Sequence, residues 1–237
     1  MFSKTINLRH ELDRAKRQAS EQDLLASVTE ILAKNKAERL DILRRLESGS
    51  GTSLNNLNLE QLESDRMYHI GHIKKVCIDY RLRFLESNMF KHDFPAEAIS
   101  EIRNLEKQHQ TTLNGFRIIA PTKAFHLLNY NDPMLFVPIG NDYYYLIHQW
   151  GDDLKASRKW LVWPLRNIGT FTLLCLAVSI FVTLIFPVNR LGENIRMATI
   201  IVFLFAFKSI FAVFMYGFFM GGRKFSAQMW NSKFYNS

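Results

Sequence analysis

The sequence predicts an α+β cytoplasmic domain, made of N-terminal helices and a small antiparallel sheet, followed by a two-helix transmembrane hairpin. Two apolar runs of membrane length, Ile168–Phe186 and Met197–Met220, close the chain. Ahead of them, a helix-patterned half gives way to short apolar segments bounded by Pro, Asn and Asp, which is typical of strands. Charge is divided as well: residues 1–150 carry 20 Lys and Arg against 19 Asp and Glu, whereas residues 151–237 carry 10 against 3.

The basic excess of the C-terminal part bears on the partners of the protein. Because this excess flanks the apolar runs, it is placed to attract anionic lipid headgroups. A nucleic-acid-binding protein would instead concentrate positive charge on its soluble domain. We therefore expect membrane lipids as partners and no nucleic acid. The two cysteines, Cys77 and Cys175, are too few for a disulfide framework, which suits a cytosolic domain.

Residues 1–48 are predicted to form an N-terminal helical segment because they are rich in Lys, Arg, Glu, Ala and Leu. Apolar residues recur there at helical spacing, among them Leu8, Leu12, Leu24, Val28 and Ile31. Ser20 with Asp23 is a capping pair that would divide two helices. The apolar spacing fails at residues 34–39, and a long coiled coil needs several unbroken heptads. The segment is therefore expected to be a helical hairpin or a short self-associating coiled coil, packed on a partner helix or within the chain.

A stretch rich in Gly and Ser makes residues 49–58 a flexible linker ahead of the α+β cytoplasmic domain at residues 59–150. Leu59–Glu86 carries an apolar stripe at helical spacing, which predicts one long helix. Pro95 is a favoured first-turn residue and opens a second helix, which ends before Asn114.

Four short apolar segments follow these helices, at residues 116–120, 124–128, 134–137 and 143–150. Gly140-Asn141, between the last two segments, suits a two-residue hairpin turn with positive φ at Gly140. Pro138 places its strand at a sheet edge or a bulge, because proline has no amide hydrogen for the ladder. These segments predict a small antiparallel sheet packed on the preceding helices.

The membrane part begins with an interfacial helix or linker at residues 151–167. It continues with the transmembrane hairpin at 168–220 (spans 168–186 and 197–220) and ends with an aromatic and basic tail at 221–237. At about 1.5 Å per residue, both spans cross a hydrocarbon core of about 30 Å. Seven Lys and Arg flank the hairpin and two lie in its loop. The positive-inside rule therefore places both termini in the cytoplasm, and the membrane is the inner one if the source is bacterial. The expected interfacial anchors are Trp160, Trp163, Arg223, Lys224 and Trp230.

Lys208 is the only charged residue inside either span, and it lies near the middle of the second. A lysine at the bilayer centre costs about 2.5–3.5 kcal/mol on insertion scales. Neither span contains Asp or Glu, so the candidate partners within the hairpin are hydroxyl groups. The membrane-embedded polar residues are Thr172, Ser179 and Thr183 in the first span, with Ser209 beside the lysine.

The polar stripe bears on how the two spans pack and on what Lys208 contacts. Packing the stripe against the Ser209, Ala212 and Tyr216 side of the second span would allow close approach and hydrogen bonds. Lys208 would then bond to Ser179 or nearby carbonyls, face water in an oligomeric pore, or meet an acidic residue of another membrane protein. The simplest alternative is that a thinned bilayer tolerates the charge.

The best metal-like set is Asp65, His69 and His72, whose offsets of four and three residues place them on one face of the predicted long helix. Two imidazoles and a carboxylate would hold a divalent metal with open positions. The spacing matches no strong catalytic motif, so a solvated helix face is the simpler interpretation. The sequence has no phosphate-cradling glycine loop, nucleophile elbow or paired acidic motif. We predict no enzymatic activity and no cofactor, with a divalent metal at these residues as the alternative.

The predicted function is a two-pass integral membrane protein that acts as an oligomeric anchor or scaffold and whose cytoplasmic domain binds a partner or ligand. The partner is another copy of the chain, another membrane protein or a cytoplasmic protein. The first alternative is a sensor-effector whose transmembrane hairpins assemble into a membrane-permeabilising pore, which the polar stripe and Lys208 motivate. The second alternative is a metal-dependent membrane enzyme.

Overall fold

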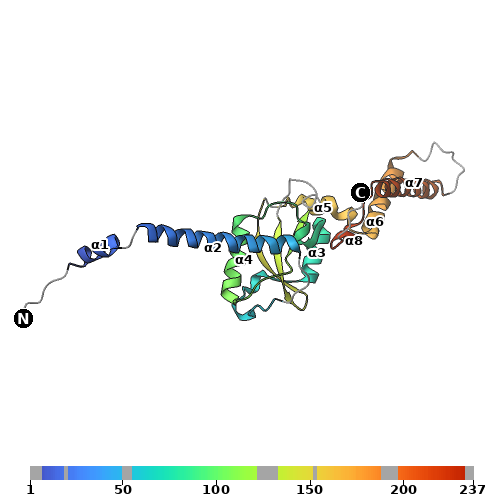
Figure 1. The fold of residues 1–237 in the computed structure, drawn as a ribbon. Helices are drawn as coiled ribbons and strands as arrows, with labels where there is room; N and C mark the ends of the chain where they lie inside the picture. Colours follow the sequence, from blue (N-terminus) through green and yellow to red (C-terminus); the bar gives the residue numbers. More distant parts are fainter. Residues whose placement is uncertain are drawn as a thin grey trace, which may run out of the picture. The chain divides into compact units, whose positions relative to one another are not determined.

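The computed structural model describes residues 7–18, 21–49, 55–121, 133–151, 154–187 and 197–232, and the chain divides into two units, 1–44 and 45–237. The first unit contains α1 (Leu8–Gln18) and most of α2 (Glu21–Ser48), so the N-terminal helices predicted from the sequence are present (Figure 1). Ser20, half of the predicted capping pair, lies outside the described residues. α2 continues through residues 34–39, where the apolar spacing fails. Ala, Lys, Glu and Arg in this stretch are good helix formers, so the helix does not depend there on a buried apolar face.

A five-stranded antiparallel sheet forms the centre of the second unit, in the order β1-β5-β4-β3-β2. This sheet confirms the small antiparallel sheet predicted from the sequence. The predicted segment at 124–128 lies outside the described residues. The strands are β1 (Met67–His69), β2 (Leu82–Glu86), β3 (Arg117–Pro121), β4 (Met134–Gly140) and β5 (Tyr143–Gln149).

The prediction of one long helix over Leu59–Glu86 is wrong. This stretch is divided into η1 (Leu59–Gln61), η2 (Ser64–Arg66), β1, α3 (Ile70–Tyr80) and β2. α3 ends because Arg81 adopts a left-handed conformation, with φ of 53°. The apolar run that follows is buried nearly throughout, as in a strand covered on both faces. Periodicity alone does not distinguish such a short apolar run from a buried piece of helix.

α3 and α4 (Ala96–His109) cover the two faces of this sheet (Figure 1). On the α3 face, Phe84 meets Phe136 edge-on at 5.9 Å between ring centroids and Tyr144 at 5.0 Å. Cys77 of α3 is fully buried in the same cluster, and burial raises the pKa of its thiol to about 12. α4 contacts β5, whose buried Tyr145 points to the opposite face from Tyr144. The sheet is therefore the middle layer of three.

The β4–β5 hairpin turn lies one residue later than predicted. Its two turn residues are Asn141 and Asp142, with φ of 49° and 62°, which is the type I′ pattern that matches the twist of the strands. Gly140 has a positive φ of 130° but belongs to β4, where it pairs with Tyr143. The strand register shifts between Pro138 and Gly140, so the proline lies at a bulge of a strand inside the sheet order.

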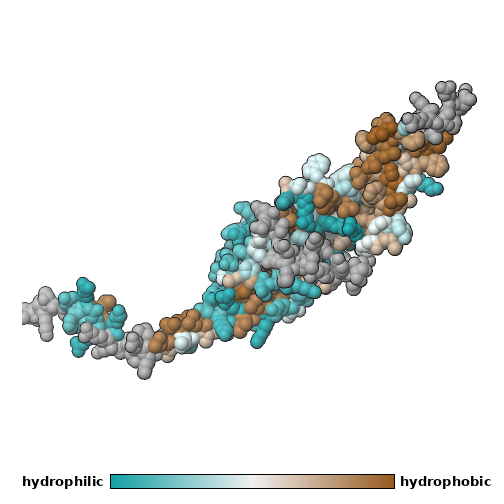
Figure 2. Space-filling view, turned by 90° about the horizontal axis from the view of Figure 1, so that it is seen from above, coloured by the Kyte–Doolittle hydropathy of each residue, from teal (hydrophilic) through white to brown (hydrophobic). Residues whose placement is uncertain are grey.

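Two long apolar helices follow the sheet: α6 (Ile168–Ile185) and α7 (Ala198–Met220). Both are long and apolar enough to cross a membrane, and most of their residues are exposed, unlike the core helix of a soluble protein. Figure 2 shows the apolar surface gathered over them. Shorter elements complete the unit: η3 (Ser87–Met89), α5 (Ser157–Val162), η5 (Trp163–Leu165) and α8 (Ser226–Met229).

Candidate functional site at the base of the apolar helices

The segment after α7 folds back onto the edge of the sheet. β2 is an edge strand, and the backbone amide of Phe84 donates a hydrogen bond of 2.7 Å to the carbonyl of Trp230. The Trp230 indole packs on the core cluster beneath α3, and the Lys74 ammonium lies 5.5 Å from the centre of that ring. An open sheet edge is a template for unwanted pairing, and this segment occupies part of it.

The segment before α6 is bonded to the same end of α3. The Arg166 guanidinium forms an ion pair with the Asp79 carboxylate at 3.1 Å, and the Arg166 carbonyl accepts from the amide of Ala227 at 3.0 Å. Arg158 donates through Nε to the carbonyl of Tyr80 at 2.8 Å. We call this meeting point the joint: residues 79–84, 158–166 and 223–232. It connects the sheet to the residues on either side of the apolar helices.

Arginines from all three segments gather at the joint. Arg81 donates through Nη2 to the carbonyl of Lys224 at 3.3 Å, and its Nη1 is buried with no hydrogen-bond partner among the described residues. Arg83 is buried and reaches the carbonyl of Ser232 at 3.5 Å. Burial lowers the pKa of Arg81, and the positive charges of Arg223, Arg83 and Arg158 lower it further. Burial also lowers the pKa of Arg158. The joint therefore concentrates positive charge in a partly desolvated place.

The hydroxyl groups that form the polar stripe of α6 are largely buried, and they donate hydrogen bonds to carbonyls of their own helix. Ser179 and Thr183 are buried together with Cys175, whereas Thr172 is half-buried. Ser179 donates to the Cys175 carbonyl at 2.6 Å, and Thr183 donates to the Ser179 carbonyl at 2.8 Å. Thr172 likewise donates to the carbonyl of Ile168. Such bonds to the preceding turn satisfy a hydroxyl in an apolar environment without a second helix.

The expected packing side of α7 is wrong. Ser209, Ala212 and Tyr216 are exposed, and aromatic and aliphatic side chains face α6 instead. Phe171 of α6 lies within ring-contact distance of Phe211 and Phe218, at 6.0 and 6.2 Å. Large rings bury more area than the small residues that would permit close backbone approach, so they determine the contact. The contacting residues of α7 and its flank are Phe207, Ile210, Phe211, Met215, Phe218 and Phe225.

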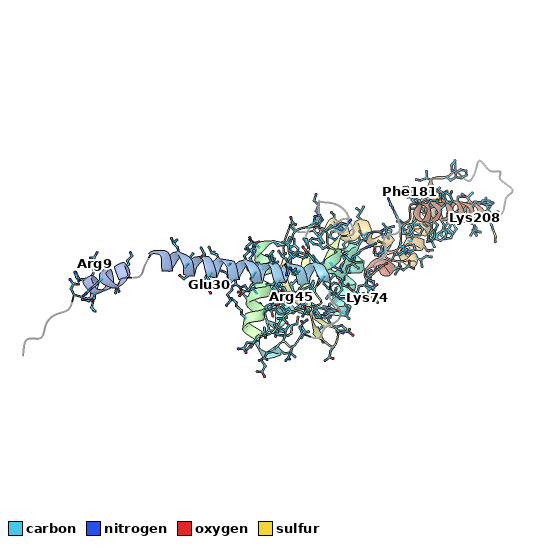
Figure 3. The ribbon with its side chains drawn as sticks, viewed as in Figure 1. Arg9, Glu30, Arg45, Lys74, Phe181 and Lys208 are labelled. Atoms are coloured by element: carbon cyan, nitrogen blue, oxygen red, sulfur yellow. The ribbon has the colours of Figure 1, made fainter. Side chains whose placement is uncertain are left out.

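Lys208 is exposed on α7, outside the face that packs on α6 (Figure 3). Among the described residues, it makes no hydrogen bond or ion pair. Ser179, its predicted partner, is fully buried and bonded to its own helix. The ammonium therefore faces the surroundings of the helix pair.

The predicted interfacial residues are found in two different settings. Trp160 of α5 is 82% exposed, and Trp163 is partly exposed. By contrast, Trp230 is packed on the sheet, while Arg223 and Lys224 belong to the joint. An exposed indole beside basic residues is typical of a ring at headgroup level.

The structure keeps two of the predicted metal ligands near each other, with 6.3 Å between the ring centroids of His69 and His72, but it divides the predicted helix that carried all three. Asp65 lies in η2, His69 ends β1 and caps α3, and His72 lies in the first turn of α3, so the single helix face that suggested the site does not exist. The His69 Nδ1 accepts from the amide of Gly71 at 3.1 Å, and its ring meets Tyr143 at 5.1 Å. Within the described ranges, no three His, Cys, Asp or Glu side chains are grouped so as to hold a metal ion.

A small polar cavity of about 130 Å³ opens between η1, η2, α4 and β5. Glu63 and Arg66 form an ion pair of 2.9 Å on one side, and the buried Tyr145 lies on another. Burial raises the pKa of the Tyr145 phenol. The cavity has room for several waters or one small polar molecule. Its lining is Gln61, Glu63, Arg66, Glu101, Asn104, Leu105, Gln108 and Tyr145.

No family model, curated protein or solved structure matches this chain.

Sequence reasoning missed both the joint and the cavity. Placing residues 59–86 in one helix concealed η1 and η2, which line the cavity. It also concealed β2, where Arg83 is 3% exposed inside an otherwise apolar run. An arginine within a strand-length apolar run was the available signal, because a charge that is buried needs hydrogen-bond partners. Ser232, whose carbonyl Arg83 reaches, lies 149 residues further along the chain, so the pattern does not identify it.

Proposed function

We propose that the protein is a two-pass integral membrane protein, with both termini in the cytoplasm, that acts as an oligomeric anchor or scaffold. Its sheet domain is the cytoplasmic part and binds a partner or ligand. The observation that carries this proposal is the joint. The Asp79–Arg166 ion pair and the bond from Phe84 to Trp230 attach the sheet to residues just before α6 and soon after α7. A domain attached on both sides stays at the membrane surface instead of moving on a free linker.

The orientation follows from charge. Lys and Arg are more frequent in the segments flanking the two apolar helices than in the segment between them, with seven against two. Because these flanking segments contact the sheet domain at the joint, the sheet domain and the basic flanks share one side of the membrane. The positive-inside rule makes that side the cytoplasm.

Self-association is supported by a row of exposed apolar residues on α2. Leu25 and Leu32 lie seven residues apart on one stripe, with Val28 between them, and all three are exposed within their unit. Two such stripes that pack together remove apolar surface from water at about 25 cal/mol per Å². Helices with this spacing associate as short coiled coils.

The double substitution Leu25→Glu/Leu32→Glu is expected to reduce the oligomer to a monomer, because it places two negative charges on the proposed contact. The mass of the full-length protein in nanodiscs measures the effect. Lys34→Glu changes the net charge by the same amount on the opposite side of α2 and should leave the oligomer intact. A wild-type protein that is monomeric, with no co-purifying partner, would refute the oligomeric part of the proposal.

A second candidate function is a sensor-effector whose hairpins assemble into a membrane-permeabilising pore. One observation favours it: Lys208 is exposed on α7 and makes no hydrogen bond or ion pair with the described residues, beside the exposed Ser209. A lysine in this position costs about 2.5–3.5 kcal/mol on insertion unless water or an acidic group meets it. A water-lined assembly would supply that contact.

Lys208→Leu tests this second candidate. If hairpins line a pore, the substitution abolishes dye leakage from liposomes that contain the protein, whereas Lys208→Arg retains it because the charge remains. If the hairpin is only an anchor, the Lys208→Leu variant should insert into the membrane more readily than the wild type, with an unchanged oligomeric state. Wild-type protein that releases no dye, at any pH, membrane tension or lipid composition tried, would exclude the pore.

A further inference from the structure

We propose that the arginines of the joint bind a phosphate group, supplied by the headgroup of an anionic phospholipid. The residues are Arg81, Arg158 and Arg223. This inference deepens the proposed function, since it names a ligand class for the membrane-facing side of the sheet domain. It requires membrane attachment, and it does not require an oligomer.

The first argument is the convergence of the arginines from three separate segments. Arg158, from α5, is hydrogen-bonded to the carbonyl of Tyr80, the residue directly before Arg81. Arg81 in turn is hydrogen-bonded to the carbonyl of Lys224, the residue directly after Arg223. The Arg158 guanidinium therefore lies at the backbone beside Arg81, and the Arg81 guanidinium lies at the backbone beside Arg223. Like charges brought together in this way repel, so an anion bound among them would stabilise the arrangement.

Second, Arg81 has no anionic partner among the described residues. The carboxylate of Asp79 lies at the joint, but it is already paired with Arg166 at 3.1 Å. Arg81 uses Nη2 for two contacts, with the Lys224 carbonyl and the Met229 sulfur, and neither partner is an anion. Its Nη1 is buried without a partner in the described part of the chain. A buried donor that lacks an acceptor is costly, and an anionic oxygen placed there would remove the cost.

The third argument concerns the kind of anion. A guanidinium presents a planar fork of donors that matches phosphate oxygens in pairs, and charge-assisted bonds of this kind are about twice as strong as neutral ones. A cluster of guanidinium groups suits a phosphate group, which has more acceptor oxygens than a carboxylate.

The fourth argument is position, which identifies the source of the phosphate. Arg158 precedes the first residue of α6 by ten positions, and Arg223 follows the last residue of α7 by three. Trp160 and Leu161, next to Arg158, are exposed, as expected for side chains that reach into the headgroup layer. The basic cluster therefore lies where two membrane-length helices begin and end, at the depth of lipid phosphates.

The test uses full-length protein in detergent, with its thermal midpoint and bound-lipid mass followed during titration. The probes are a short-chain phosphatidylglycerol, a short-chain phosphatidylcholine and inorganic phosphate, at matched ionic strength. We expect phosphatidylglycerol to bind and to raise the midpoint, whereas phosphatidylcholine does not. Arg81→Gln and Arg158→Gln should each weaken binding about tenfold, the effect of losing a charge-assisted hydrogen bond.

Two further variants make the result decisive. Arg223→Gln removes an exposed arginine and should weaken binding without altering the fold, so it serves if Arg81→Gln fails to fold. Lys107→Gln removes one positive charge from the exposed side of α4 and should leave binding unchanged. Equal binding of the two lipids, or equal effects of Arg223→Gln and Lys107→Gln, would overturn the proposal. Inorganic phosphate that stabilises as well as the lipid would overturn the lipid source and leave a free phosphate ligand. A monomer that binds phosphatidylglycerol would refute only the oligomeric part of the proposed function.

Discussion

Replacing Arg45 with alanine is expected to destabilise the sheet domain by about 3 kcal/mol, near the lower end of the cost of breaking a buried ion pair. The Arg45 guanidinium contacts both carboxylate oxygens of Glu106 and also donates to the carbonyl of Leu113 at 2.8 Å. The side chains of Arg45 and Glu106 are only 16% and 15% exposed, respectively. Without Arg45, the Glu106 carboxylate remains buried without its cationic partner and keeps the amide of Leu113 as a hydrogen-bond donor. Thermal unfolding followed by near-ultraviolet circular dichroism measures the loss.

A comparison of two ion pairs separates burial from mere pairing. Glu63 and Arg66 lie 2.9 Å apart, but Glu63 is 64% exposed, so Glu63→Ala should cost less than about 1 kcal/mol. The double variant Arg45→Met/Glu106→Met should cost less than the sum of the two single changes, because no unpaired charge is left behind. Equal costs for Arg45→Ala and Glu63→Ala would contradict the role assigned to the buried pair.

Trp230→Ala is expected to open the joint and to lower the free energy of unfolding by about 2 kcal/mol. This loss is smaller than for a fully buried tryptophan because the Trp230 ring is partly exposed. The substitution removes the ring that packs on the sheet core and lies beneath the Lys74 ammonium. Once the ring is gone, the hydrogen bond between the Phe84 amide and the carbonyl of residue 230 loses its support. Two measurements check this: the unfolding midpoint, and hydrogen exchange at the Phe84 amide, which should become faster.

Trp160→Ala is the matched control for this prediction. It removes an identical side chain, close to α6, that is 82% exposed. We expect no change in the unfolding midpoint or in exchange at Phe84, since exposed side chains contribute little to folding stability. The same loss of stability in both variants would show that Trp230 does not hold the joint together.

The sequence predicts those parts of the fold whose pattern is local. α6 and α7 follow from apolar runs of membrane length, of which the second contains Lys208 as its one charge. β4 and β5 follow from two short runs on either side of turn residues. β2 did not follow, because Leu82–Glu86 continues the apolar spacing of α3 and the break at Arg81 is a matter of backbone conformation. The face of α7 that contacts α6 was not predicted from the sequence either. Close approach through Ser209 and Ala212 is possible in principle, but the phenylalanine rings on the other side bury more surface.

The joint was harder to predict because the contacts that hold its three segments together are long-range. Phe84 and Trp230 are far apart in the chain, as are Asp79 and Arg166, and no spacing rule connects either pair. The net positive charge of residues 151–237 indicated that the region meets anions. It did not indicate that Arg81, from the balanced half of the sequence, belongs to the same cluster. That assignment requires the folded chain.

The bond between β2 and residue 230 also sets an order of events during synthesis. A ribosome makes Phe84 long before Trp230, and it makes both apolar helices in between. The sheet can pair its strands as soon as β5 has emerged, yet the outward amide of Phe84 has no partner until the segment after α7 has been released. This edge of the sheet is therefore closed only after the chain has been made through α7.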